Sequence, residues 1–158
     1  MTSEDKSLSP KPGLLVWASR TGRTLQVCQT VAEVLGDAGF SVELINVAEY
    51  QGDPREHPFL LTASPTYGVG DLHPQWDQLE RSWRDWDFQG LPSAALGCGS
   101  SRYPVPCGAV EILETRMRNQ GARILLPALK LDTLAGLDLT LAETWAHRFV
   151  EALKALKP

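Results

Sequence analysis

Short apolar runs alternate along this chain with stretches whose apolar residues recur every three or four positions. Five runs predict β-strands, at residues 14–18, 40–47, 59–63, 93–98 and 124–131. Four stretches predict amphipathic helices, which begin near residues 24, 74, 107 and 140. Strict alternation of strands and helices is typical of a parallel sheet with right-handed crossovers and helices on both faces. We therefore expect one three-layer α/β domain.

Two of the predicted strands carry signs of a sheet edge. Residues 40–47 alternate, with Ser41, Glu43 and Asn46 outward, whereas 14–18 is continuously apolar, as expected for a strand covered on both faces. Pro127 lies inside the fifth strand and has no N–H for a neighbouring strand. With the second and fifth strands at the edges, we expect the order 2-1-3-4-5. The ligand crevice of such a sheet lies at the carboxyl ends of strands one and three.

The helical stretches predict which residues form the core. The expected stripes are Leu25, Cys28, Val31 or Ala32, and Leu35; Trp76, Leu79, Trp83 and Trp86; Val110, Leu113 and Met117; and Leu141, Trp145, Phe149, Leu153 and Leu156. We interpret the tryptophan stripe as packing rather than partner docking, and we expect Trp17 in the core. Thr140 and Glu143 have the spacing of a capping box, so the last helix should begin there.

The loop at residues 19–24, Ser-Arg-Thr-Gly-Arg-Thr, joins the first strand to the first helix. Free N–H groups in a first helical turn, together with the helix dipole, favour an anion. Ser19, Thr21 and Thr24 can donate hydrogen bonds, and Gly22 lets the backbone come close. The loop lacks both the Gly-Lys-Ser/Thr end of a nucleoside-triphosphatase loop and the Gly-x-Gly-x-x-Gly fingerprint. The pattern therefore predicts a seat for a monophosphate on a cofactor.

Two further loops, at residues 64–73 and 97–106, follow the third and fourth strands and should reach the same edge. The first carries Tyr67 beside Gly68 and Gly70, and the second carries Tyr103. Stacking between aromatic rings is worth roughly 0.5–1.5 kcal/mol beyond the burial of area. Two aromatic rings beside a phosphate seat indicate a planar aromatic cofactor held between them.

Three motifs carry a family resemblance: Ser19-Arg-Thr-Gly-Arg-Thr24, Ser64-Pro-Thr-Tyr-Gly-Val-Gly70 and Leu96-Gly-Cys-Gly-Ser-Ser-Arg-Tyr103, with Cys107-Gly-Ala opening the next helix. On these motifs the chain resembles the flavodoxins, especially the short-chain group, and the flavin mononucleotide (FMN) domains of sulfite reductase and the diflavin reductases. The resemblance extends over about residues 13–157. It implies a flavodoxin-like fold and FMN as the cofactor.

The resemblance also implies a role for each loop. Residues 19–24 would bind the FMN phosphate, Tyr67 and Tyr103 would flank the isoalloxazine, and the backbone of 66–70 and 98–103 would meet its polar edges. Asp132 loosely matches a position that is often acidic in the family. The full implied cofactor-binding set is Ser19, Arg20, Thr21, Gly22, Arg23, Thr24, Pro65, Thr66, Tyr67, Gly68, Val69, Gly70, Cys98, Gly99, Ser100, Tyr103, Cys107 and Asp132.

The chain departs from the family pattern in its charges. Ser100 stands where an acidic or amide residue is usual, Arg102 directly precedes Tyr103, and Arg20 and Arg23 lie in the phosphate loop. We interpret these arginines as solvated charges rather than direct phosphate ligands. A nearby cation favours an anionic reduced flavin, whereas a carboxylate disfavours it. We therefore expect the second one-electron potential to be less negative than in strongly acidic flavodoxins.

Composition narrows the class of protein. The 158 residues are 43% hydrophobic, which suits one domain with a full core, and the formal net charge of −4 argues against nucleic acid as the main partner. Cys28, Cys98 and Cys107 have no metal-ligand spacing and indicate free thiols in a reducing cytoplasm. Cys107 stands at a predicted helix start, which can lower a thiol pKa. No apolar run approaches membrane-spanning length, and residues 1–13 are expected to form a flexible leader before the domain at 14–158.

These observations favour a monomeric FMN-binding electron carrier without a catalytic residue or a metal site. It would accept electrons from a pyridine-nucleotide-dependent flavodoxin or ferredoxin reductase and pass them singly to a redox enzyme. Exposed acids (Asp71, Asp77, Asp132 and Asp138) could steer basic partners. Two alternatives remain open: an FMN-dependent NAD(P)H reductase of quinones or similar small molecules, and a flavin-free interaction module of the same fold.

Overall fold

The computed structural model describes residues 11–67 and 70–156 and contains a mixed sheet between two layers of helices. The sheet strands are β1 (Gly13–Trp17), β2 (Val42–Asn46), β3 (Leu60–Tyr67), β4 (Asp71–Leu72), β5 (Pro92–Gly99), β6 (Arg123–Ile124) and β7 (Leu129–Asp132). The helices are α2 (Arg23–Asp37), α3 (Trp76–Trp83), α4 (Gly108–Asn119) and α5 (Leu139–Lys154), with short 3-10 turns η1 (Val47–Glu49) and η2 (Pro54–Glu56).

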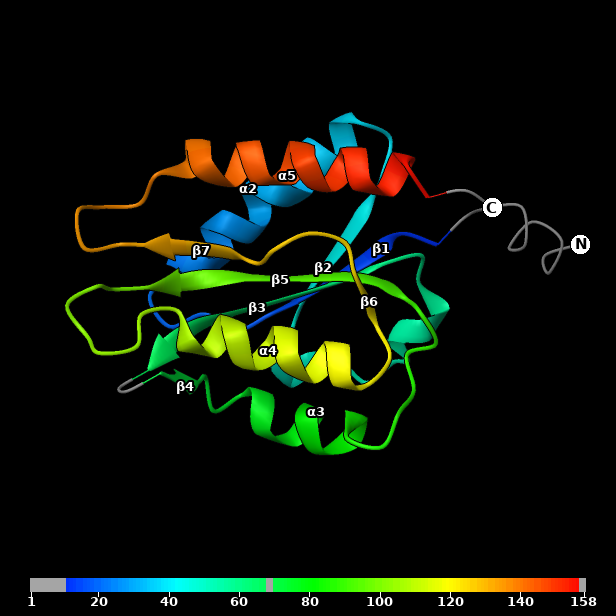
Figure 1. Ribbon diagram of the computed structural model, residues 1–158, viewed down its shortest axis with the longest axis horizontal. Coiled ribbons are helices and arrows are strands. Elements are labelled where there is room, and N and C mark those ends of the chain that lie inside the picture. The colour runs from blue at the N-terminus through cyan, green and yellow to red at the C-terminus, as the bar shows by residue number, and fades with distance from the viewer. Residues whose placement is uncertain (1–10, 68–69, 157–158) are drawn as a thin grey trace, which may run out of the picture.

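The parallel part of the sheet has the expected order. The hydrogen-bonded path runs β2-β1-β3-β5-β6, and β7 also pairs with β5. Numbered along the chain, with β6 and β7 as one fifth strand, this is 2-1-3-4-5, so the α/β fold class is confirmed. In Figure 1, α2 and α5 cover one face of the sheet and α3 and α4 cover the other.

The alternation of side chains in β1 divides the core into two clusters. Leu15 points to the α2 and α5 side, where it joins Val31 and Phe149. Leu14 and Val16 point to the opposite side and pack with residues of α3 and α4. Because apolar side chains leave both faces of the same strand, the strand lies buried between two helical layers, as its continuous apolar run predicts.

Several boundaries differ from the sequence-based expectation. The expected fifth strand is broken at Pro127, and both pieces pair only with β5, which keeps the proline at an edge. β3 continues through Tyr67 and then pairs antiparallel with β4, so part of the expected loop 64–73 is a hairpin. β5 likewise continues to Gly99. Long-range pairing extends strands beyond the residues that look apolar.

Three details of the helices are also corrected. Asp138, not Thr140, caps α5: its carboxylate accepts a hydrogen bond from the Thr140 N–H at 2.9 Å. Leu141, which was expected in the apolar stripe, is 52% exposed. Trp86 lies beyond the end of α3, and Trp17 is half-buried rather than core.

At the start of the domain, Gly13 already belongs to β1, although the expected leader ran to residue 13. The Pro12 carbonyl oxygen lies 2.9 Å from His57 Nδ1, and the Lys11 ammonium pairs with Glu56 at 3.3 Å. Residues 1–10 of that expected leader lie outside the described part of the chain.

Candidate cofactor site

The loop between β1 and α2 leaves a helix N-terminus open. Gly22 occupies the N-cap of α2 with φ of 91°, a left-handed conformation that suits glycine, and no side chain caps the helix. The Ser19 hydroxyl accepts a hydrogen bond from the Gly22 N–H at 3.0 Å, which orders the loop. The first N–H groups of α2 therefore have no side-chain cap, and together with the helix dipole they form a site suited to an anion.

Thr24, in the first turn of α2, is 1% exposed, unlike its exposed neighbours Thr21 and Arg23. Burial raises the pKa of Cys98, at the carboxyl end of β5, while the Thr24 hydroxyl and the charge of Arg23 act in the opposite direction. Thr24 thus connects the phosphate loop to β5, and Cys98 stays a protonated thiol near neutral pH.

The hairpin of β3 and β4 forms a second wall. Pro65 pairs in register with Cys98, and the Gly70 N–H donates to the Tyr67 carbonyl at 3.0 Å across the hairpin turn. Gly68 and Val69, both in the predicted cofactor set, lie outside the described residues. The Thr66 hydroxyl accepts a hydrogen bond from the Ala109 N–H at 3.2 Å. This side chain therefore binds a backbone N–H group in the first turn of α4.

The half-buried Tyr67 ring has two neighbours that were not expected from the sequence. The Arg20 guanidinium carbon lies 5.3 Å from the ring centroid, a cation–π distance, and the His73 ring lies 5.0 Å away with a 40° tilt. His73 Nδ1 accepts a hydrogen bond from the Gln75 N–H at 3.0 Å. Burial, followed by the charge of Arg20, lowers the pKa of His73, which is therefore neutral at pH 7.

The sequence pattern did not single out His73, and this contact was missed. The hairpin of β3 and β4 returns the chain so that His73 lies beside Tyr67, six positions earlier. A strand–turn–strand reading of residues 64–73 would have provided the signal. Arg20 is exposed, as expected of a solvated charge, yet it also covers Tyr67.

The loop after β5 is held by Asp132 at the end of β7. The Asp132 carboxylate accepts hydrogen bonds from the Ser101 and Leu134 N–H groups, each at 3.0 Å, and these bonds lower its pKa. The Ser100 hydroxyl accepts from the Arg102 N–H at 3.2 Å. Tyr103 ends this turn with 54% of its surface exposed. In the described structure Asp132 therefore orders the loop that presents Tyr103.

Close contacts between backbone segments at Gly99 and Gly108 form the third side of the site. A Cβ atom on Gly99 would lie 2.4 Å from the Cys107 nitrogen, and one on Gly108 would lie 2.8 Å from Gly70 Cα. These glycines let the β5 loop, the β3–β4 hairpin and the start of α4 meet. Cys107 itself is buried, its thiol donates to the Leu131 carbonyl at 3.6 Å, and burial raises its pKa to about 11. At Cys107 the effect of burial therefore outweighs any lowering of the pKa by the helix start.

The three loops end at one edge of the sheet, beyond β1, β3 and β5, where the crevice was expected (Figure 1). This edge gathers an uncapped helix N-terminus, a half-buried tyrosine and an exposed tyrosine. The family model for flavodoxins matches residues 15–145 of the chain. The chain belongs to the flavodoxin family.

Individual relatives agree with this flavodoxin assignment. The chain is 32% identical over 145 residues to a flavodoxin from Nitratidesulfovibrio vulgaris, a match that covers 89% of this chain and 97% of that protein. It is 28% identical to the flavoprotein alpha-component of a Cronobacter sakazakii NADPH sulfite reductase, over 91% of this chain and 24% of that protein. Among solved structures, oxidised flavodoxin 1 from Bacillus cereus superimposes with a TM-score of 0.81 at 24% identity, covering 91% and 98% of the two chains.

FMN is the cofactor of flavodoxins and thus of this chain, and the local chemistry fits it. The open N-terminus of α2 provides N–H donors for a phosphate, and the two tyrosines provide flat surfaces for a ring system. Within the described residues, no group of His, Cys, Asp and Glu side chains is arranged to bind a metal ion. None of the described helices has the length and apolar character needed to cross a membrane.

Proposed function

We propose that this flavodoxin carries single electrons, as a cytoplasmic monomer, from a pyridine-nucleotide-dependent reductase to a redox enzyme. The observation that carries the proposal is the meeting of the open α2 N-terminus with Tyr67 and Tyr103 at one sheet edge. When bound, FMN supplies the electron chemistry, while the protein contributes binding, orientation and electrostatics.

Each part of the edge would have a separate task. The N–H groups of the first turn of α2, with Ser19 and Thr21, would hold the phosphate. Tyr67 would cover one side of the flavin ring, and Tyr103 would cover the other. The exposed position of Tyr103 leaves the rim of this edge open to a partner protein.

Acidic side chains at this edge, which also carries the exposed Arg20, Arg23 and Arg102, support a basic partner. Asp71 begins β4, Asp132 ends β7 and Asp138 caps α5; all three are exposed. Exposed charges of one sign at the mouth of a site raise association rates with oppositely charged partners, and salt screens the effect. Transfer rates to such a partner should therefore fall as ionic strength rises.

Reduction of the FMN-loaded protein by NADPH through a ferredoxin–NADP+ reductase tests the proposal. NADPH gives two electrons, so the reductase must pass one electron to each of two carrier molecules. We expect rapid reduction with the reductase present and negligible NADPH oxidation by the flavodoxin alone. Steady NADPH oxidation without the reductase, accelerated by an added quinone, would instead support a small-molecule reductase. A protein that fails to bind added FMN would support the flavin-free interaction module.

A further inference from the structure

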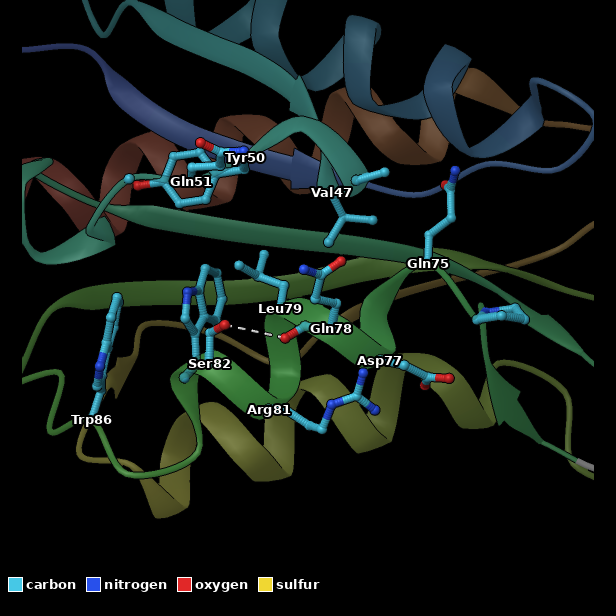
Figure 2. A pocket seen from close by; sticks show the side chains of 14 residues that line it. Val47, Tyr50, Gln51, Gln75, Asp77, Gln78, Leu79, Arg81, Ser82 and Trp86 are labelled. Carbon is cyan, nitrogen blue, oxygen red and sulfur yellow. Dashed lines mark hydrogen bonds between the residues drawn. The ribbon is translucent and has the colours of Figure 1, made fainter.

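A cavity of about 690 Å³ lies between α3 and the segment from Val47 to Gly52. Figure 2 shows Tyr50 and Gln51 on one side of this cavity, facing Leu79 and Ser82 of α3 on the other. Trp86 and Gln75 stand at its two ends. None of the residues that we assign to the FMN site lines it. Pockets for small molecules in proteins commonly have volumes of about 300–1,000 Å³.

Two buried hydrogen-bond donors in the cavity wall lack partners. Tyr50 is 8% exposed and Trp83 is 5% exposed, yet neither the Tyr50 hydroxyl nor the Trp83 indole N–H makes a hydrogen bond. Trp76 and Trp145 differ, since their indole N–H groups donate to the carbonyls of Ala63 and Pro127. Buried donors are normally satisfied, so two orphans that line one cavity indicate a ligand that brings acceptors.

The surrounding charges favour a neutral ligand. Burial, followed by the negative charges of Asp53, Glu43 and Glu56, raises the pKa of Tyr50, so its hydroxyl remains a donor across the physiological pH range. The same acidic groups would repel an anion that accepted a hydrogen bond from this phenol. Gln51, Gln75 and Gln78 add uncharged polar groups to the lining, and the charges of Asp77 and Arg81, which also line the cavity, are opposite in sign. An uncharged acceptor such as a carbonyl suits this wall.

Aromatic rings give the cavity a flat wall. Trp83 and Trp86 are stacked, with centroids 6.3 Å apart and planes 24° apart, and Tyr50 meets Trp83 edge-on at 6.3 Å. The Arg55 guanidinium carbon lies 4.9 Å from the centroid of the Trp86 ring, a cation–π distance. Gly52 leaves room for the phenol, because a Cβ there would lie 2.8 Å from the Tyr50 hydroxyl. Such a wall fits a planar ring system by stacking.

We propose that the cavity between α3 and residues 47–52 binds a small, neutral, planar aromatic compound that carries a carbonyl acceptor at its ring edge. Tyr50 and Trp83 donate the hydrogen bonds that recognise the carbonyl, and the stacked tryptophans contact the ring. This ligand site is separate from the FMN site and does not depend on the proposed electron carriage.

Coumarin, which has two fused rings and one ring-edge carbonyl, is a suitable probe for a titration of the FMN-saturated protein. Two-dimensional proton–nitrogen NMR follows the indole N–H signals, and Trp83→Phe identifies the Trp83 signal by its loss. We expect the Trp83 signal to shift in a saturable way while the Trp76 and Trp145 signals stay in place. Tyr50→Phe, which removes only the hydroxyl, should weaken binding by about 3–10-fold.

Thr30→Val is the matched control, since it removes a hydroxyl from α2 on the opposite face of the sheet and should leave coumarin affinity unchanged. A Trp83 signal that does not move up to the solubility limit of coumarin overturns the proposal. Equal affinity of Tyr50→Phe and the unmodified protein also overturns it, because the phenol would then not recognise the ligand. A shift of all indole signals together would indicate non-specific association and count against the site.

Discussion

At the scale of single residues, Tyr67 and Tyr103, which we propose contact the flavin, differ in burial and in their neighbours. Tyr67 is half-buried and already contacts Arg20 and His73, so changes there alter the protein as well as the cofactor site. Tyr103 is 54% exposed at the end of a turn that Asp132 and Ser100 order. Tyr103 therefore offers the cleaner test of flavin contact.

Tyr103→Ala should separate cofactor binding from folding. Because the side chain is exposed, we expect the free energy of unfolding of the apoprotein to change by no more than about 0.5 kcal/mol. Loss of stacking and buried area should weaken FMN binding by about tenfold. Calorimetric titration with FMN measures this, and Tyr103→Phe, which keeps the ring, should bind nearly as well as the unmodified protein. Unchanged FMN affinity in the alanine variant would remove Tyr103 from the site.

Arg20 should tune the flavin through its charge. A cation near the flavin favours the anionic fully reduced form, so Arg20→Gln should make the second one-electron potential more negative. We expect a shift of about 20–60 mV, since 59 mV corresponds to a tenfold change for one electron. Spectroelectrochemistry measures the shift, with Arg84→Gln as a control for an exposed arginine beyond the end of α3. A zero shift, or equal shifts in both variants, would contradict the role of Arg20.

Asp132 should make the loop that carries Tyr103 sensitive to acid. Its folded-state pKa lies below the ordinary value of 3.8 because the Leu134 and Ser101 N–H groups bind the carboxylate. A lowered carboxyl pKa stabilises the fold above the unfolded-state pKa, and that stabilisation is lost as pH falls through the lower folded-state value.

Asp132→Asn should therefore have a lower free energy of unfolding than the unmodified protein at pH 7. On acidification below pH ~4, the free energy of unfolding of the variant should fall by less than that of the unmodified protein. Denaturant unfolding at both pH values tests this, and amide exchange at Ser101 reports the loop itself. Glu143→Gln, in an exposed position of α5, is the control for removal of a carboxylate elsewhere. Identical acid sensitivity of Asp132→Asn and the unmodified protein would contradict the assignment.

At the scale of secondary-structure elements, the periodicity of apolar residues predicted which elements exist better than where they end. The capping-box spacing placed the start of α5 at Thr140, whereas Asp138 provides the cap. Both residue types are good N-caps, so local sequence offered two solutions. The backbone direction of the preceding loop decides between them, and this direction depends on the tertiary structure.

The cap of α5 can be tested with two single variants. Asp138→Ala should lower the free energy of unfolding by about 1 kcal/mol, because it leaves the Thr140 N–H without its acceptor. Thr140→Ala keeps that acceptor and should stay within about 0.5 kcal/mol of the unmodified protein. Chemical denaturation compares the two, and a larger loss for Thr140→Ala would restore the capping box.

At the scale of the whole molecule, the sheet order followed from few residues. The apolar run at Leu14–Val16 and the proline at position 127 distinguished a central from an edge strand, and these signals are local. The contacts of Tyr67 with Arg20 and His73 could not be predicted in this way, because they join a loop after β1 to a hairpin after β3. The left-handed backbone of Cys107 and its buried thiol likewise depend on packing against Gly99.

The cavity beside α3 likewise could not be predicted from local sequence signals. The sequence pattern identified Trp76, Leu79 and Trp83 as a packed stripe, and all three are indeed buried. Periodicity describes which face of a helix is covered, but it does not show that Tyr50 approaches from another segment and leaves two donors unpaired. Sites formed between elements therefore need the assembled fold before they can be recognised.

An anaerobic potentiometric titration of the FMN-loaded protein tests the central claim most directly. We expect two separate one-electron steps, with a flavin radical detectable by electron paramagnetic resonance between them. The second one-electron potential should be less negative than that of strongly acidic flavodoxins. A single two-electron step without a detectable radical would contradict one-electron carriage.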